Sequence, residues 1–412
     1  MKAFTEPLLS LAGFEEMTKT AEKSSGLISV TGCIDAQKSQ MIYAFGGHRK
    51  NKLIVTFGEQ KAKELYDEYS FFDKEVVYYP SKDVLFYQSD IRGNLLTAER
   101  IRALKAIREQ ERVTLVTTFD ALMNTMAPIE KMWENVLTLE QGQLLDLKEI
   151  QAALIRMGYE KEYQVQTMGQ FSVRGGILDV FPLTEENPIR IELWGDEIDT
   201  IRYFDCESQK SIENTDRVSI YPAAELVLSD EEKAGGIEKL KAEAKRVSDK
   251  LRKQMKTEEA HRVTVMADEL TEEWGELSMY AGMDAFLSYF FDERVGLLDY
   301  FKPSDSLIFF DELTRCTEQG KLTETEFSES MKQRLAMGYI LPGQMNGLFT
   351  EKEIVAKLEK YSCIALGALD NKANGLHQLG SYGIHCQSVS PYNNSFELLI
   401  KDLKRYKKNG YR

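Results

Sequence analysis

Cysteine is scarce in this chain of 412 residues, and the five copies stand far apart: Cys33, Cys206, Cys316, Cys363 and Cys386. There is no C-x-x-C pair and no histidine at metal-ligand spacing. Disulfide frameworks and zinc sites need paired or closely spaced ligands, so the pattern argues against both. It is typical of a protein kept in the reducing cytosol, and a cytoplasmic location is the expectation.

Long apolar runs and an excess of positive charge are also missing. No run approaches the roughly 18 apolar residues that a membrane span needs, and the first residues lack the features of an export signal. Aspartate and glutamate number 66 against 52 lysines and arginines, which gives a net charge of −14. DNA affinity depends largely on neutralised phosphates, so tight DNA binding by this chain alone is not expected. The sequence favours a protein partner and no membrane.

Recognisable catalytic sets are equally absent. The four histidines lie near no candidate nucleophile with a supporting pattern, so no Ser/His/Asp or Cys/His set can be assembled: His48, His261, His377 and His385. No cofactor and no metal are expected.

What is present is a regular alternation of short β-rich runs and helical runs between residues 26 and 126. The expected strands are 27–30, 52–57, 75–80 and 113–118, and the expected helices are 36–45, 59–69 and 96–110. Such alternation is the signature of a parallel sheet wrapped by helices.

The pattern changes near residue 130. Apart from a helix at 147–157, the chain to about 222 is strand after strand with short turns, which indicates a compact antiparallel domain. A long charged helix follows at about 229–256, and buried-strand runs return at 307–310 and 363–367. The sequence therefore predicts an α/β domain, split in sequence, that is interrupted by an inserted antiparallel β-rich domain.

The expected boundaries follow from these changes of pattern. Residues 1–128 and 225–385 would be the two parts of the α/β domain, and 129–224 the insertion. Residues 386–412 would begin a further domain. Its helix 395–408 is followed at once by Asn409-Gly410 and the last residue, Arg412, so we expect later domains to be missing from this sequence.

The most informative stretch is QFSVRGGILDVFPLTEENPIRIELW, residues 170–194. Strand side chains alternate, so in the last strand of this stretch one face carries Ile189, Ile191 and Leu193, and the other carries Arg190, Glu192 and Trp194. Arg174 of the preceding strand points outward in the same way. A sheet face with two arginines and a tryptophan is composed like a protein-binding hot spot. The alternative is that Trp194 caps a second core layer under a loop.

A second candidate site is TGCIDAQKS (31–39), at the junction of the first strand and its helix. A phosphate-binding loop has the form G-x-x-x-x-G-K-[ST] at such a junction. Gly32, Lys38 and Ser39 are in register, but Gln37 replaces the second glycine and Asp35 adds a negative charge. Both changes disfavour a triphosphate. The loop is either a nucleotide site or a relic of one.

The matching acidic pair would be Asp311-Glu312, at the end of the strand 307–310. In an ATPase the Asp would hold Mg²⁺ through water and the Glu would polarise the attacking water. With the altered loop, the pair is interpreted as a vestige. If the site is vestigial, we expect Asp35 to be the N-cap of helix 36–45, with the side chains of Gln37 and Lys38 over the loop.

Basic residues are concentrated in helix 239–256 and near the end of the sequence, at 401–408. Such runs are usually solvated helix faces, and a DNA contact is the alternative.

Several separated blocks together resemble the UvrB-homology module of the bacterial transcription-repair coupling factor (Mfd) family. They are QFSVRGGILDVFPL, PIRIELWGDEIDTIRYFDCESQKS, YYPSKDVLFYQSD (78–90) and GLLDYFKPSDSLIFFDEL (296–313). UvrB itself is the nearest competitor. It should show an intact phosphate-binding loop and, after the strand 113–118, an aromatic-rich hairpin, and this sequence has neither.

The resemblance implies a RecA/helicase-like sheet domain without ATPase activity, and an inserted domain that recruits UvrA. The matching UvrA-binding positions are Arg174, Arg190 and Trp194, the last more usually Phe in this family. RNA polymerase-binding and ATP-dependent DNA translocase domains would follow Arg412, which adds RNA polymerase and DNA as partners of the full-length protein. Two alternatives stay open: a nucleotide-binding helicase half, and UvrB-like binding of damaged DNA.

Overall fold

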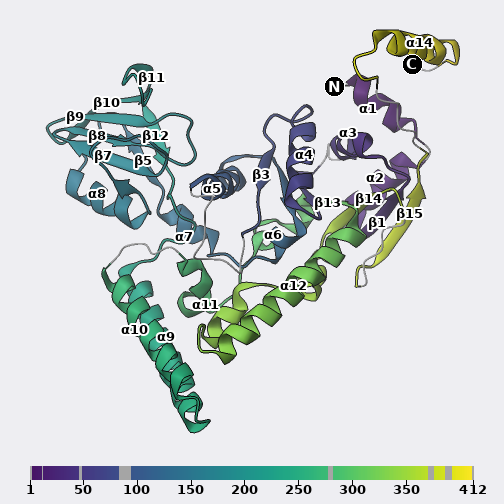
Figure 1. Ribbon diagram of the computed structural model, residues 1–412. Helices are drawn as coiled ribbons and strands as arrows, with labels where there is room; N and C mark the ends of the chain where they lie inside the picture. The colour runs from purple at the N-terminus through teal and green to yellow at the C-terminus, as the bar shows by residue number, and fades with distance from the viewer. Residues whose placement is uncertain are drawn as a thin grey trace.

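The computed structural model of the chain describes residues 2–11, 13–45, 49–82, 94–276, 282–369, 375–385 and 392–410. It contains a large parallel sheet and a separate, mostly antiparallel sheet (Figure 1), so the predicted fold class is confirmed. Part of the block 78–90, the residue Cys386 and the first residues of the segment 386–412 lie outside the described residues.

The parallel sheet has seven strands in the order β15-β1-β14-β13-β2-β4-β3, and all neighbours run parallel. Its strands are β1 (Gly26–Thr31), β2 (Asn51–Thr56), β3 (Val77–Tyr79), β4 (Val113–Thr118), β13 (Ser306–Asp311), β14 (Ser362–Gly367) and β15 (Gln378–Gly383). The strands expected at 27–30, 52–57, 75–80, 113–118, 307–310 and 363–367 are therefore all present. Strands that precede the insertion in the sequence and strands that follow it therefore belong to one sheet.

Helices pack on both faces of this sheet, and they bury the strand side chains that point to either side. In β13, Leu307 and Phe309 join the core under one helical layer, while Ile308 and Phe310 join the core under the other. The first layer contains α1 (Lys2–Leu9), α2 (Phe14–Lys23), α3 (Asp35–Phe45) and α4 (Glu59–Tyr69). The second contains α5 (Asn94–Glu109), α6 (Phe119–Met123), α7 (Ile129–Glu134), α12 (Leu313–Ala336) and α13 (Glu351–Leu358).

The inserted region forms a six-stranded sheet, in the order β11-β10-β9-β8-β7-β6, and a separate two-stranded sheet. The six strands are β6 (Glu160–Lys161), β7 (Gln170–Arg174), β8 (Ile177–Val180), β9 (Ile189–Trp194), β10 (Glu197–Phe204) and β11 (Ser211–Thr215). Helix α8 (Leu147–Arg156) packs its Leu154 against the inner face of this sheet. The two-stranded sheet pairs β5 (Leu137–Glu140) with β12 (Arg217–Ile220). Since Leu137 lies opposite Ile220, the insertion begins and ends at one place.

After the insertion, α9 (Asp230–Lys253) and α10 (Thr257–Glu276) form a long hairpin that projects from the molecule (Figure 1). A capping box of Ser229 and Glu232 begins α9. The hairpin has its own apolar core with η2 (Met283–Phe286) and α11 (Leu287–Phe290), centred on the fully buried Trp274.

The remaining elements are short or peripheral. They are η3 (Leu297–Tyr300), η4 (Pro303–Asp305), η5 (Pro342–Gly347) and α14 (Phe396–Lys408), which has no buried residue. Within the part of the chain that is described, no helix combines the length and apolar character needed to cross a bilayer.

Candidate functional site

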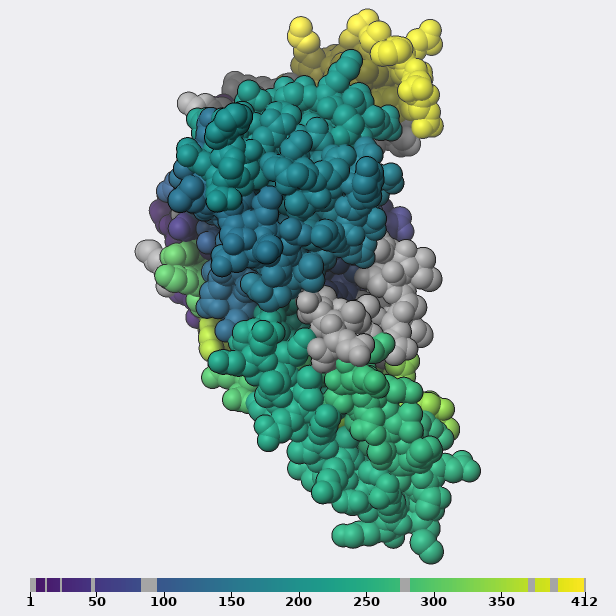
Figure 2. Space-filling view, turned by 90° about the vertical axis from the view of Figure 1, so that its left-hand side faces the viewer, coloured from purple at the N-terminus to yellow at the C-terminus, as the bar shows by residue number. Residues whose placement is uncertain are grey.

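The first candidate site is the outer face of the six-stranded sheet. The insertion that contains this sheet is the blue to teal upper part of the molecule in Figure 2. Strand β9 alternates as predicted: Ile189 and Ile191 are buried, and Arg190 is turned to the other side. Trp194 ends the strand and is 84% exposed. The alternative that Trp194 caps a second core layer is therefore wrong.

Arg174 and Arg190 converge on one carboxylate, that of Asp179. In the sheet register Asp179 of β8 lies directly opposite Arg190 of β9. Arg190 donates from Nε to Oδ1 at 2.7 Å and from Nη2 to Oδ2 at 2.8 Å, which is a bidentate pair. Arg174 donates from Nη2 to the same Oδ2 at 2.9 Å. The structure thus brings both predicted arginines together through a buried acid between them.

Arg190 is held from two further directions. Its Nη2 also donates to Oε1 of Gln209 at 2.8 Å, and its guanidinium lies 4.3 Å from the ring centroid of Phe204. Gln209 belongs to the turn between β10 and β11, which folds back over this end of the sheet. The hydrogen bonds to Asp179 raise the pKa of Arg190 above its ordinary value, so the guanidinium stays charged.

A second ion pair lies beside the first on the same face. Arg202 of β10 donates from Nη1 to Oε2 of Glu192 on β9 at 3.0 Å, and Thr200 donates to the same oxygen at 3.2 Å. The hydrogen bond from Arg202 lowers the pKa of the Glu192 carboxyl. We call the surface made by Arg174, Asp179, Arg190, Glu192, Trp194 and Arg202 the arginine face.

Beyond Trp194 the surface is hollowed and acidic. The hollow has a volume of about 760 Å³ and is lined by the β5 turn, the start of β10 and the start of β12, with the carboxylates of Glu140, Glu197, Asp199 and Asp216. Arg217 also lines the hollow and pairs with Glu140 at 3.2 Å, so the hollow combines four carboxylates with one guanidinium, and Trp194 belongs to both the hollow and the arginine face.

Sequence reasoning placed Glu192 on this face but missed Asp179, Gln209 and Arg202 as members of the surface. Asp179 could have been found, because in the run ILDV it alternates with buried residues and so shares the outward face with the arginines. Gln209 carries no such signal, since it lies in a turn that only the folded chain brings to Arg190.

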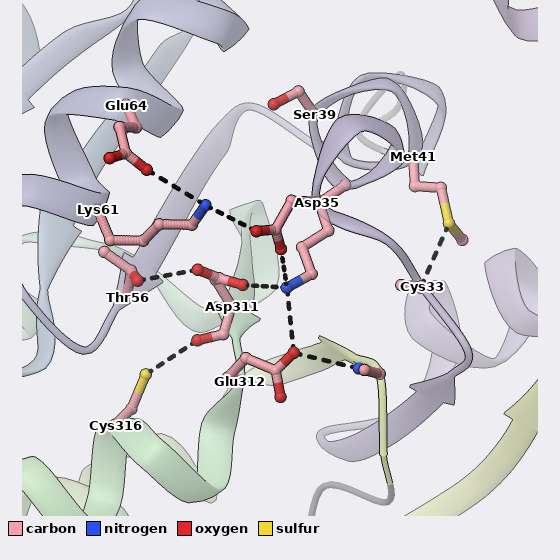
Figure 3. A network of polar contacts seen from close by, with 12 residues as sticks. Cys33, Asp35, Ser39, Met41, Thr56, Lys61, Glu64, Asp311, Glu312 and Cys316 are labelled. Atoms are coloured by element: carbon pink, nitrogen blue, oxygen red, sulfur yellow. Dashed lines mark hydrogen bonds and ion pairs between the residues drawn. The ribbon is translucent and has the colours of Figure 1, made fainter. Parts of the chain in front are cut away.

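The second candidate site is the altered phosphate-binding loop and its acidic pair, drawn in Figure 3. The chain brings these residues together at one end of the parallel sheet. The amino group of Lys38 lies 2.9 Å from Asp35 Oδ1, 2.5 Å from Asp311 Oδ1 and 3.1 Å from Glu312 Oε1. Asp311 also accepts a hydrogen bond from Thr56 at 3.0 Å. The three carboxylates therefore surround an ammonium group of the protein itself.

Burial alone would lower the pKa of Lys38, but the charge of Asp311 and its hydrogen bonds outweigh burial and raise that pKa above its ordinary value. The hydrogen bond from Lys38 likewise lowers the pKa of Asp35. Both groups are charged at neutral pH. No group of His, Cys, Asp and Glu arranged to hold a metal ion is found among the described residues.

The loop itself is covered by the chain. Gly32 has φ of +80°, and a Cβ built on it would lie 2.0 Å from the carbonyl oxygen of Ile384, which follows β15. Ser39 donates to Glu68 at 3.3 Å, and Gln37 is half-buried in the first turn of α3. The backbone around Gly32 is therefore packed against another segment of the protein.

The expectation that Asp35 is the N-cap of this helix is wrong. Helix α3 begins at Asp35 itself, so Asp35 stands in the first turn and not before it. Its carboxylate accepts hydrogen bonds from Lys38 and, at 3.1 Å, from Lys61. Two lysine side chains offer a stronger, charge-assisted partner than the backbone N–H groups of the helix terminus.

The inserted domain is similar to a known family of domains. Residues 137–226 match the family model described as the UvrB interaction domain. This segment contains every residue of the arginine face. Over most of its length the chain also resembles proteins named transcription-repair-coupling factor.

The factor of Bacillus subtilis (strain 168) is 26% identical over 360 residues, which is 87% of this chain and 30% of the relative. The factor of Staphylococcus aureus (strain MRSA252) is 26% identical over 411 residues, covering 97% of this chain and 33% of the relative. Over most of its length the chain is therefore similar to one part of these transcription-repair-coupling factors. It spans about a third of the length of these curated relatives. The residues that match the UvrB interaction domain, 137–226, make up most of the inserted region of this chain, and the outward face of this region carries the first candidate site.

Proposed function

We propose that this chain recruits UvrA in transcription-coupled nucleotide excision repair, and that the arginine face of its UvrB interaction domain is the binding surface. The observation that carries the proposal is the exposed Trp194 beside two arginines, on the domain that matches the interaction family. Tryptophan and arginine are the residues most often found at the energetic centres of protein interfaces.

The relatives' name couples transcription to repair, and their additional length leaves room for further domains. We propose that in a longer protein of this kind RNA polymerase and DNA are partners of those other domains, with an ATP-dependent translocase among them. The setting would be the cytoplasm, where transcription and repair share the chromosome.

For the altered phosphate-binding loop we propose a structural role and no ATP hydrolysis. An incoming Mg²⁺-triphosphate would have to displace Asp35, Asp311 and Glu312 from Lys38, and would meet the chain that covers Gly32. These contacts support the interpretation that the site is vestigial: Gly32, Gln37, Lys38, Ser39, Asp311 and Glu312.

The test is the affinity of purified UvrA for the 412-residue chain and for the double variant Arg174→Ala/Trp194→Ala, measured by calorimetry. These two side chains are the more exposed members of the arginine face. Arg190→Ala is avoided because it would leave the buried Asp179 without its bidentate partner. Loss of hot-spot side chains should weaken binding by about thirtyfold or more.

The matched control removes the same kinds of exposed side chain from the α/β domain, with Phe71→Ala/Arg112→Ala. It should bind UvrA as the wild type does, and both variants should keep the wild-type melting temperature within a few degrees. If Arg174→Ala/Trp194→Ala binds UvrA with wild-type affinity, the proposal that the arginine face binds UvrA is wrong.

A further inference from the structure

The arginine face contains more donors than its internal ion pairs use. A guanidinium carries five N–H donors, one on Nε and two on each Nη. Arg190 uses Nε and Nη2 on Asp179 and Gln209, which leaves the two donors of Nη1. Arg174 uses only Nη2, and its side chain is 37% exposed. The unused donors belong to two side chains that contact the same buried carboxylate, with Arg174 37% exposed and Arg190 12% exposed.

The charge of this group is also unbalanced. Arg174 and Arg190 contribute two positive charges and Asp179 one negative charge, and the neighbouring Arg202 is already paired with Glu192. One carboxylate added from outside would balance the group and could accept from both arginines. A doubly charged phosphate would reverse the imbalance.

We propose that Asp179 and Gln209 are positioning residues, which hold Arg174 and Arg190 ready to bind a single aspartate or glutamate side chain of UvrA. The inference rests on the proposed function and names the chemistry of the group that this surface accepts. Pre-organised donors bind more tightly because fewer rotamers are lost when the partner arrives.

The backbone of Gln209 supports a positioning role. Its φ is +59°, in the left-handed region that glycine adopts without strain and other residues rarely adopt. The turn is held by bonds from Gln209 N to the Asp205 carbonyl at 2.8 Å and from Gln209 Nε2 to the Cys206 carbonyl at 2.8 Å. The backbone of this turn is thus held in a strained conformation in which the Gln209 side chain accepts from Arg190, and this contact supports a positioning role.

The variant Gln209→Gly tests whether Gln209 positions Arg190 without changing the stability of the fold. Glycine relieves the left-handed conformation while removing the acceptor of Arg190, so the melting temperature should stay within a few degrees of the wild-type value. UvrA affinity, measured by calorimetry on the full chain, should fall roughly three- to tenfold, as for the loss of one hydrogen bond. The matched control is Met255→Gly, at the exposed tip of the α9–α10 hairpin with φ of +64°, which should leave affinity unchanged.

A double-mutant cycle shows whether Gln209 acts through Arg190. Arg190→Lys keeps the charge but cannot form the fork on Asp179. In the Arg190→Lys background Gln209→Gly should change UvrA affinity by less than about twofold, because the group that Gln209 orients is gone. Equal losses in both backgrounds would overturn the inference, as would wild-type affinity of Gln209→Gly. If Arg174→Ala/Trp194→Ala also binds as the wild type does, the proposed function fails as well.

Discussion

At the scale of single residues, Lys38 shows what the altered phosphate-binding loop does in this protein. Its side chain is 2% exposed and so is that of Asp311, its nearest partner. Buried charges are stable only when they are paired and hydrogen-bonded, and here one ammonium group joins α3 to the end of β13. The residues that would serve a nucleotide elsewhere thus connect two segments that lie 273 positions apart in sequence.

We expect Lys38→Met to destabilise the fold by about 3–5 kcal/mol, because it leaves the Asp311 carboxylate buried without its cation. The measurement is urea unfolding followed by circular dichroism. Adding Asp311→Asn to Lys38→Met should recover part of the loss, since the unpaired charge is removed. Lys61→Met removes a cation whose carboxylate partners, Asp35 and Glu64, are exposed to solvent, and should cost less than about 1 kcal/mol. Unchanged stability of Lys38→Met would contradict a structural role.

The sequence identified the outward residues of β9 but not their partners. Alternation is a local property, so Arg190 and Trp194 could be assigned to one face from a single strand. Asp179 and Gln209 meet Arg190 only through strand pairing and the fold of a turn. Asp35 was misplaced by one position for a similar reason: Lys61 lies on the next helix, and it is one of the two lysines that bind the carboxylate.

At the scale of elements, a buried ion network fixes the insertion to the α/β domain. Glu225, on the chain that leaves the insertion, accepts from Nε of Arg100 on α5 at 2.6 Å and pairs with Lys82 at 3.1 Å. Arg100 also donates to the carbonyl of Pro80 at 2.6 Å, and Lys82 pairs with Asp284. Elements on both sides of the insertion are thus tied together at its exit.

Glu225 makes this junction sensitive to pH. Burial alone would raise the pKa of the Glu225 carboxyl, but Arg100 and Lys82 outweigh burial and lower it to about 2. A lowered pKa in the folded state gives stability that is complete above the ordinary value of 4.5 and is lost as the pH falls toward 2. Glu225→Gln removes the titrating group and should therefore remove this part of the pH dependence.

At pH 7 we expect Glu225→Gln to lower the free energy of unfolding by about 3 kcal/mol, because Arg100 loses its charged partner. At pH 4 the difference between the two proteins should be smaller than at pH 7, because the wild type loses stability on acidification and the variant lacks the titrating group. Urea unfolding at both pH values provides the measurement, with Glu134→Gln on the exposed end of α7 as the control. A difference that stays constant or grows on acidification would show that Glu225 is not the group concerned.

Long, regularly patterned elements were predictable and weakly patterned ones were not. The helix 59–69 agrees with α4 at both ends, and the helices expected at 147–157 and 229–256 agree with α8 and α9 within three residues. Strand β15, with the sequence QLGSYG, has two glycines and few β-branched or aromatic residues. This segment forms a strand because it pairs with β1 at the edge of the sheet. Local sequence patterns do not contain information about such a pairing.

At the scale of the whole molecule, the order of strands explains how the insertion is tolerated. In the parallel sheet, β1 lies between β15 and β14, and β13 lies between β14 and β2, so strands from before and after the insertion interleave. The insertion itself starts and ends at paired strands, with Leu137 opposite Ile220. The sequence predicted a split sheet from its two blocks of strands. It could not predict the interleaving, because parallel neighbours leave no mark on local composition.

Charge is distributed unevenly over this molecule. The net charge is −14, yet one side of α9 carries four basic residues around a single acid, Asp249: Lys245, Arg246, Lys250 and Lys253. Seven acids lie on its hairpin partner α10: Glu258, Glu259, Asp268, Glu269, Glu272, Glu273 and Glu276. Charges within about 8–10 Å still act on one another at physiological salt, so the acidic helix offsets part of the attraction that the basic side would exert on DNA.

We therefore expect the chain to bind duplex DNA only weakly, and only at low salt. Fluorescence anisotropy with a labelled duplex of about 30 base pairs should show binding near 25 mM salt that disappears by about 150 mM, because few phosphates are neutralised and each released counterion adds to the salt dependence. The variant Lys245→Glu/Lys250→Glu/Lys253→Glu should abolish the low-salt binding. The control Lys321→Glu/Lys332→Glu, on α12, should retain it. Binding that persists at 150 mM salt, or that survives the triple substitution, would show that the chain contacts DNA through another surface.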